Sequence, residues 1–228
     1  MSENFAYSHS SQQGQAKSGH VGVACPQVTC KIGDKGEVLV RSPANMQGYY
    51  KDAELTAQAF DADGFLRTGD KGEIDAQGRL KITGRIKEIF KTSKGKYVAP
   101  APIEDLLLSN TDLEQVCVTG VALAQPIALA TLSESARQAM SDSRFKQKLS
   151  ESLDKLLHST NARLDKHENL STLIILPEPW TVENNLMTPT LKIKRTQVEG
   201  AFEAEFQQWC GDARSIIWTE MRLPTQSS

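Results

Sequence analysis

The stretch from residue 82 to residue 100 constrains the fold of this chain more than any other part of the sequence. It begins as a β-strand that ends at Gly84 and Arg85, and a charged segment follows directly. A short hairpin then closes around a basic turn, where Gly95 can adopt backbone angles that other residues avoid. Because Gly84 has no Cβ, the chain can change direction there. We therefore expect two structural units joined by a hinge at residues 84–88.

The bulk composition is that of a globular chain. It has 228 residues, 24% of them charged, and a formal net charge of −2. These values argue against a protein that binds nucleic acid and against a disordered tail. No apolar run approaches the roughly 18 residues that a membrane-spanning helix needs, and the polar N-terminus carries no secretory signal. We expect a cytoplasmic protein with at most peripheral contact to a membrane.

The four cysteines form no CxxC pair, and the four histidines lie far apart in the sequence. This spacing argues against a structural zinc site. We expect a reducing environment and no disulfide bonds. Cys117 lies in an alternating apolar run, so it is predicted to be a small residue of the core.

Residues 1–83 are predicted to form a small β-rich, distorted barrel-like segment. The polar residues 1–18 are predicted to be loop, residues 36–41 a strand, and residues 73–82 a hairpin. Asp52 precedes a short helical pattern and is a candidate N-cap. Since this segment has few apolar residues to bury, we do not expect it to be comfortably stable by itself.

Residues 89–228 predict a compact α+β domain in which strands alternate with helices. Apolar patterns and turn residues place strands at 113–121, 127–132 and 173–176, and helices at 102–108, 141–164 and 198–209. The predicted fold class of the whole chain is therefore α+β.

Two further motifs lie on either side of this hinge in the sequence. Upstream, Asp70 ends the motif Arg-Thr-Gly-Asp, where its carboxylate could accept two hydrogen bonds from a ribose diol or could hold its own backbone. The planar guanidinium of Arg85 could also bind those hydroxyls, or it could bind a phosphate. The alternative is an arginine that lies on the surface. Downstream, Lys192 follows a Pro-Thr loop; its ammonium could stabilise a charged phosphoryl transition state or belong to a solvated basic run.

In this order, the three motifs resemble the C-terminal half of the AMP-forming acyl-CoA synthetases. The sequence of residues 92–100, Thr-Ser-Lys-Gly-Lys-Tyr-Val-Ala-Pro, is similar to that of the long-chain fatty acid branch. The resemblance runs from Met1 to about Arg195. It implies that residues 1–83 are the last, β-rich piece of the large adenylation domain and that residues 89–228 are its mobile C-terminal lid domain.

The resemblance also implies roles for individual residues toward ATP or AMP. Asp70 and Arg85 match residues that hold the ribose, and Lys192 matches the lysine that serves adenylation. Ser2 and Glu3 resemble the end of a motif whose hydroxyl touches the α-phosphate and whose glutamate holds Mg²⁺. At a chain terminus we expect both to be mobile.

Two further roles that the resemblance implies concern coenzyme A, which reacts in the second of the family's two reaction steps. Lys87 matches the pivot of the lid, where many relatives carry Asp. The turn after the hinge matches a hairpin that lines the tunnel for CoA, and its residues are Ser93, Lys94, Gly95 and Lys96. A charged, solvated turn is the alternative for these lysines. A second departure from the family is Leu191, which stands where the broader family has Gly before the lysine.

The family also needs a phosphate-binding loop and an acyl pocket, and neither is found in this sequence. We therefore expect a C-terminal part of an ATP-dependent long-chain fatty acid–CoA ligase that lacks its N-terminal domain and is inactive alone. In the intact enzyme, fatty acid and ATP give acyl-AMP, and CoA then displaces AMP. One alternative is a non-catalytic, lid-like module that binds a nucleotide or a partner. Another, an adenylation domain that serves a carrier protein, is disfavoured by the Thr-Ser-Lys-Gly-Lys turn and by the amphipathic segment 145–164.

Overall fold

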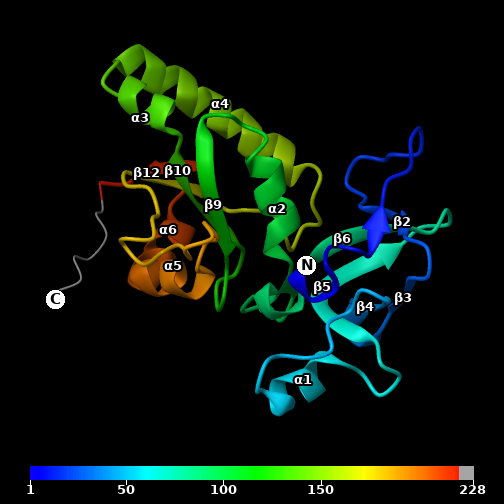
Figure 1. Ribbon diagram of the computed structural model, residues 1–228. Coiled ribbons are helices and arrows are strands. Elements are labelled where there is room, and N and C mark those ends of the chain that lie inside the picture. The colour runs from blue at the N-terminus through cyan, green and yellow to red at the C-terminus, as the bar shows by residue number, and fades with distance from the viewer. Residues whose placement is uncertain (221–228) are drawn as a thin grey trace. The chain divides into compact units, whose positions relative to one another are not determined.

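The computed structural model describes residues 1–220 and divides into two compact units, Met1–Glu88 and Ile89–Ser228 (Figure 1). Both units mix helices with β-sheet, and the predicted α+β class is confirmed. Within residues 1–220, no helix combines the length and the apolar character that crossing a lipid bilayer requires.

The first unit is built on a six-stranded sheet in which every neighbouring pair is antiparallel. In spatial order its strands are β1 (His9–Ser10), β2 (Gly22–Ala24), β6 (Arg79–Arg85), β5 (Leu66–Ile74), β4 (Glu37–Arg41) and β3 (Thr29–Ile32). Its helical elements are η1 (Ser2–Asn4), η2 (Asp34–Gly36), α1 (Ala53–Ala59) and η3 (Ile86–Glu88).

Local sequence signals set two of these elements. The side chain of Asp52 accepts a hydrogen bond from the backbone N–H of Leu55 at 2.9 Å, which confirms the predicted cap of α1. The turn between β5 and β6 is held by Asp75, whose carboxylate accepts from the N–H groups of Gln77 and Arg79. The Arg79 guanidinium and these N–H groups lower the pKa of Asp75 to about 2.

The polar start of the chain is more ordered than its composition predicts. The prediction of loop throughout residues 1–18 is wrong for η1 and for β1, which pairs with β2. The reason is tertiary: Asn4 is buried, and the N–H of Met46 donates to the carbonyl oxygen of Glu3 at 2.7 Å. Because these partners lie far away in the sequence, the local composition does not predict them.

The core of the first unit is small, as the sequence predicts. Its buried cluster consists of Val38, Val40 and Leu80, with Val28 and Cys30 packed against it. Large apolar side chains remain on the surface, including Phe5 and Tyr50, which are 84% and 88% exposed. The unit therefore buries little of the apolar area that stabilises a domain.

The second unit contains a four-stranded sheet and a two-stranded hairpin. In the larger sheet the order is β12 (Ile216–Trp218), β11 (Leu173–Leu176), β10 (Ile127–Leu132) and β9 (Leu113–Thr119). Strands β10, β11 and β12 are parallel, and β9 is antiparallel to β10. The hairpin pairs β7 (Phe90–Lys91) with β8 (Tyr97–Val98).

Helices cover both faces of this sheet. One buried cluster joins the sheet to α2 (Pro100–Leu107) and α4 (Ser143–Asn161), and α3 (Glu134–Ala139) contributes Ala136. The other cluster joins it to α5 (Arg195–Phe202) and α6 (Phe206–Gly211), which are separated by η4 (Glu203–Glu205). Side chains alternate along β10, so that Ala128 and Ala130 face the first cluster while Ile127 and Leu129 face the second.

The structure differs from the sequence prediction at several helix ends. Helix α2 begins at Pro100 rather than at residue 102, and the single helix predicted for 198–209 is broken after Phe202. The break lets Phe202 and Phe206 both pack against Trp209, at ring-centroid distances of 6.0 and 6.3 Å. Strand β12 was not predicted, because a three-residue apolar run has no periodicity to identify it.

A buried amide ties two distant segments of the second unit together. The Gln115 side chain donates to the carbonyl oxygen of Trp180 and accepts from the Trp180 N–H, both at 2.8 Å. Its oxygen also accepts from the Thr131 hydroxyl at 2.8 Å. This network closes the residues after β11 onto β9 and β10, and it gives the buried Gln115 amide and the Trp180 backbone groups their partners.

We predict that Gln115→Ala lowers the free energy of unfolding of the second unit by about 2–4 kcal/mol, because it leaves buried backbone groups unpaired. Urea unfolding followed by tryptophan fluorescence measures this change, since all three tryptophans lie in the second unit. Gln147→Ala, at an exposed position of α4, is the matched control and should change the midpoint little. Equal effects of the two substitutions would contradict the prediction.

Candidate functional site

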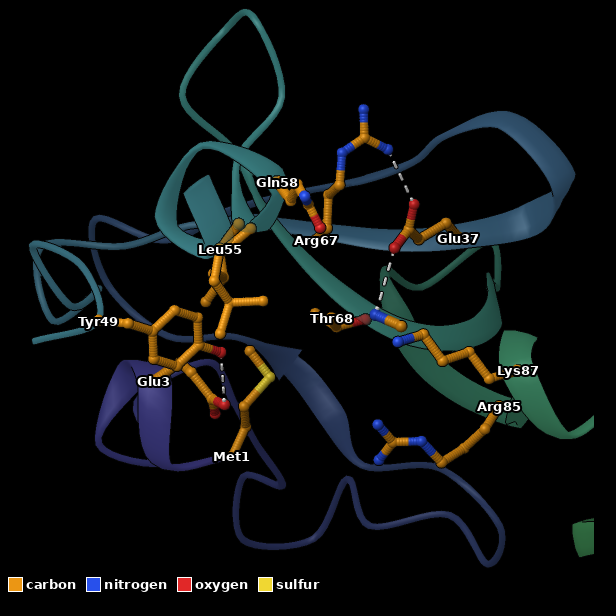
Figure 2. A pocket seen from close by; sticks show the side chains of 13 residues that line it. Met1, Glu3, Glu37, Tyr49, Leu55, Gln58, Arg67, Thr68, Arg85 and Lys87 are labelled. Carbon is orange, nitrogen blue, oxygen red and sulfur yellow. Dashed lines mark hydrogen bonds and ion pairs between the residues drawn. The ribbon is translucent and has the colours of Figure 1, made fainter. Parts of the chain in front are cut away.

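The first unit carries a cavity of about 380 Å³ beside Thr68 and Gly69 of β5 (Figure 2). Charged and polar side chains converge on it from elements far apart in sequence. They include Glu3, Glu37, Tyr49, Arg67, Arg85 and Lys87. The cations outnumber the carboxylates, so this wall suits an anionic ligand with polar hydroxyls.

Thr68 and Gly69 lie in an irregular, bulged part of β5 that is held in place by hydrogen bonds to β4. Gly69 has a φ of +71°, which a residue without Cβ adopts at no steric cost. The Thr68 hydroxyl donates to the Val38 carbonyl at 2.7 Å and accepts from the Asp70 N–H at 3.1 Å. The Glu37 carboxylate accepts from the Gly69 N–H and pairs with Arg67, each at 3.2 Å (Figure 2). The backbone before Asp70 is therefore fixed in advance of any ligand.

Asp70 and Arg85 lie opposite each other on β5 and β6. Their side chains approach to 3.4 Å, with 26% of Asp70 and 54% of Arg85 exposed. Burial raises the pKa of Asp70, while the Arg85 guanidinium works against that rise and Glu88 adds to it. In residues 1–220, Arg85 is the one cation that pairs with the Asp70 carboxylate. The carboxylate therefore keeps capacity to accept hydrogen bonds from a ligand.

Asp70 does not line the larger cavity; it lines a smaller one of about 220 Å³ on the same unit, together with Asn4, Ser8 and His9. Burial lowers the pKa of His9, whose Nδ1 lies 2.6 Å from the Ser8 hydroxyl. The paired Asp70 and Arg85 thus line different cavities of the first unit, Asp70 the smaller one and Arg85 the larger one.

The two residues at the start of the chain differ in their surroundings. Glu3 lines the larger cavity and accepts a hydrogen bond from the Tyr49 hydroxyl at 3.3 Å (Figure 2). Burial raises the pKa of Tyr49, and the nearby Glu3 carboxylate raises it further. Glu3 is therefore held by side-chain and backbone bonds, although we expected a mobile terminus. Ser2 is exposed and does not line the cavity.

No group of three or more His, Cys, Asp or Glu side chains in residues 1–220 is arranged to hold a metal ion. Glu3 offers a single carboxylate at the cavity. Mg²⁺ is often held by one or two carboxylates and completes its shell with phosphate and water oxygens. Glu3 could therefore supply one ligand to a magnesium ion that is bound together with a phosphate, but it does not form a complete metal site by itself.

In the second unit, Lys192 lies opposite Thr188 in a tight hydrogen-bonded loop that leads into α5. The Thr188 N–H donates to the Lys192 carbonyl at 2.8 Å, and the Lys192 N–H donates to the Thr188 hydroxyl at 3.0 Å. Leu191 has a φ of +59°, in the left-handed region that favours glycine. This conformation gives a physical reason for the glycine that the broader family carries there. The Lys192 side chain is exposed and makes no ion pair within the described part of the chain.

The predicted basic hairpin also lies in the second unit. The Thr92 N–H donates to the Lys96 carbonyl at 2.9 Å, and Gly95 closes the turn with a φ of +77°. Ser93, Lys94 and Lys96 are all exposed. The tip therefore presents two ammonium groups to solvent on a rigid turn.

The predicted site residues thus fall into two groups. Asp70, Arg85, Glu3 and Lys87 lie in the first unit, and the structure brings the last three to one cavity. Lys192 and residues 93–96 lie in the second unit. Sequence reasoning missed Glu37 and Tyr49, which reach this cavity through partners at least 30 residues away. No local signal marks either residue.

Comparison with known proteins identifies the family. The AMP-binding enzyme C-terminal domain matches residues 87–211. Long chain acyl-CoA synthetase 7, peroxisomal, of Arabidopsis thaliana is 32% identical over 232 residues, which cover 89% of this chain and 33% of that protein. The long-chain-fatty-acid–CoA ligase FadD15 of Mycobacterium tuberculosis is 34% identical over 209 residues, which cover 86% of this chain and 35% of that protein.

A solved structure matches as well. The A-PCP didomain of a carboxylic acid reductase from Segniliparus rugosus, in complex with AMP, has a TM-score of 0.66 and 26% identity. The match covers 81% of this chain and 28% of that one. The chain spans about a third of the length of the curated relatives it matches. It belongs to the AMP-forming acyl-CoA synthetase family and corresponds to the C-terminal part of its members.

Proposed function

We propose that this chain serves as the C-terminal part of an ATP-dependent long-chain fatty acid–CoA ligase. The observation that carries the proposal is the pair of Asp70 and Arg85, which lie opposite each other beside a hydrogen-bonded glycine bulge, with Arg85 on the wall of the larger cavity. The similarity to two long-chain ligases supports the substrate class. The reaction joins a fatty acid carboxylate to the α-phosphorus of ATP with loss of pyrophosphate, and the CoA sulfur then displaces AMP from the acyl carbon.

On this proposal, the first unit holds the nucleoside. Asp70 accepts hydrogen bonds from the ribose hydroxyls, and the Arg85 fork lies close enough to share them or to meet a phosphate. The hydrogen-bonded segment of β5 before Asp70 needs no rearrangement, so little entropy is lost on binding. Glu3 takes part in holding Mg²⁺, which would neutralise phosphate charge when bound.

Lys192 acts in the first half-reaction. Negative charge collects on the phosphoryl oxygens as the carboxylate attacks, and an ammonium on a flexible stem can meet that charge. The support is its exposure and its lack of an ion pair within residues 1–220, together with the hydrogen-bonded loop that carries it. A lysine already committed to a carboxylate could not serve in this way.

The second half-reaction uses the hinge and the basic hairpin. Lys87 lies in η3, one residue before the end of the first unit, and is the proposed pivot of the lid. Gly95 permits close approach of the pantetheine arm of CoA, and Lys94 and Lys96 attract its phosphates. Residues 1–83 would then be the last piece of the large domain and residues 89–228 the lid.

We predict that Lys192→Ala slows adenylation by about 10²–10³-fold, because one charge contact that forms only in the transition state is lost. A suitable enzyme is a chimera in which this chain replaces the matching part of the Mycobacterium tuberculosis relative. Pyrophosphate release reports the first step, and thioester formation from supplied acyl-AMP should be spared. Lys155→Ala, at an exposed position of α4, is the control. Equal damage to both steps would assign Lys192 a structural role.

A second prediction uses the pH dependence of stability. Since the pKa of Asp70 is raised in the folded chain, folding disfavours its carboxylate above that pKa, and the penalty disappears as the pH falls through it toward 3.8. Asp70→Asn should therefore stabilise the first unit at pH 7 and lose this advantage in acid. Chemical denaturation followed by the amide signals of β5 and β6 measures the effect.

Asp75→Asn provides the opposite case in the same unit. Its carboxylate has a lowered pKa, about 2, so it stabilises the fold at neutral pH and the contribution is lost as the pH falls through that value. Asp75→Asn should destabilise the first unit at pH 7. If Asp70→Asn destabilises to a similar degree, Asp70 is a structural turn residue and not a ligand-binding one.

The third prediction concerns the pivot. Lys87→Pro fixes φ near −65° and removes an N–H donor, so only one orientation of the lid should remain accessible. In the chimera we expect adenylation to persist and thioester formation from supplied acyl-AMP to fall, while Lys87→Ala should retain both. If Lys87→Pro slows both steps by the same factor, or neither, the pivot lies elsewhere.

A further inference from the structure

A charged pair in the second unit joins the base of the Lys192 loop to the sheet. Arg195 is the first residue of α5, and its guanidinium meets both carboxylate oxygens of Glu104 on α2, at 2.8 and 3.0 Å. Only 17% of the Arg195 side chain and 13% of the Glu104 side chain are exposed. Both contacts come from Nη2, while Nη1 donates to the Val118 carbonyl, so the two arms of the guanidinium reach two different partners in a way that a single ammonium does not reproduce.

The same pair caps the edge of the sheet. Strand β9 lies at the edge, so its outward backbone groups have no neighbouring strand. The Val118 N–H donates to Glu104 at 2.7 Å, and the Val118 carbonyl accepts from Arg195 at 2.8 Å. One turn further along α5, Glu199 accepts from the Thr119 hydroxyl at 2.7 Å. Helix α5 is thus fixed to β9 in both position and rotation.

This fixation extends to the loop that precedes α5. Lys194 is the residue before the helix, and its N–H donates to the Leu186 carbonyl at 2.8 Å, which closes the base of the loop. Lys192 lies two residues earlier and pairs with Thr188 across the loop, so residues 188–192 are hydrogen-bonded to one another. The bridge between Met187 and Ile193 joins this hydrogen-bonded loop to its base. The loop therefore moves as one piece with its base, and its position depends on the position of the first turn of α5.

We propose that Glu104 and Arg195 are positioning residues for adenylation, which set the place of the Lys192 ammonium without touching substrate. The inference rests on the proposed role of Lys192. A small displacement of a catalytic cation costs much rate even when the fold is intact. The pair thus has a function beyond stability, which is to keep a strained, exposed loop in register with the sheet.

The first test uses the chain by itself and needs no activity. Glu104→Gln keeps an acceptor for the Val118 N–H and removes the charge, and Arg195→Lys keeps the charge and removes the fork. In both variants, hydrogen exchange of the Thr188, Lys192 and Lys194 amides should accelerate by about tenfold or more. Exchange of the β10 amides should not change. Uniform acceleration throughout the second unit would show that the pair only stabilises the fold, and no acceleration would overturn the link to the loop.

The second test uses the chimera. Each variant should slow pyrophosphate release by about 10- to 100-fold and leave thioester formation from acyl-AMP unchanged. The double variant should be little worse than either single one, because the two residues act as a unit. Glu151→Gln and Arg163→Lys, at exposed positions, are the matched controls. Equal loss in both half-reactions, or full additivity, would overturn the proposal.

The two tests separate the possible failures. If Lys192→Ala leaves adenylation intact, the proposed catalytic role fails, whereas the exchange experiment still decides whether the pair holds the loop. If Lys192→Ala is damaging and the pair variants are not, Lys192 is positioned by other contacts.

Discussion

The enclosure of strand β10 is the constraint on which the second unit depends. No side chain from Ile127 to Leu132 is more than 3% exposed, so both faces of the strand must be covered. Helices α2 and α4 cover one face, and α5 and α6 cover the other. The two layers are connected across the edge strand β9, where the charged pair of Glu104 and Arg195 joins α2 to α5. The Lys192 loop immediately precedes α5 and is therefore attached to this pair of layers.

The first unit is stabilised in a different way. Its buried cluster is small, and its order comes largely from side-chain hydrogen bonds to the backbone at a helix cap, a turn and a bulged strand, made by Asp52, Asp75 and Thr68. Polar groups that hold a turn leave its neighbours in fixed positions. Asp70 and Arg85 gain defined places in this way, although burial opposes the charge on Asp70. A carboxylate kept in an unfavourable setting is typical of a residue retained for binding.

Much of the fold could be predicted from the sequence because its signals are local. The periodicity of α4, the cap of α1 and the apolar runs of β9 and β10 each lie within one element. The sequence could not predict β1, β12 or the break after Phe202, which depend on partners far along the chain. The same division holds for the site. Asp70, Arg85 and Lys192 stand in recognisable motifs, whereas Glu37, Tyr49 and Glu104 acquire their contacts only in the folded chain.

The most direct measurement is a crystal structure of the chimeric ligase with a non-hydrolysable acyl-adenylate analogue. We predict that the Asp70 carboxylate accepts hydrogen bonds from both ribose hydroxyls, at about 2.5–3.0 Å, with Arg85 beside it. The Lys192 ammonium should lie within hydrogen-bond distance of the phosphoryl or acyl oxygens. An analogue bound with its ribose on other residues, while Asp70 stays paired with Arg85 alone, would contradict the proposed nucleotide site.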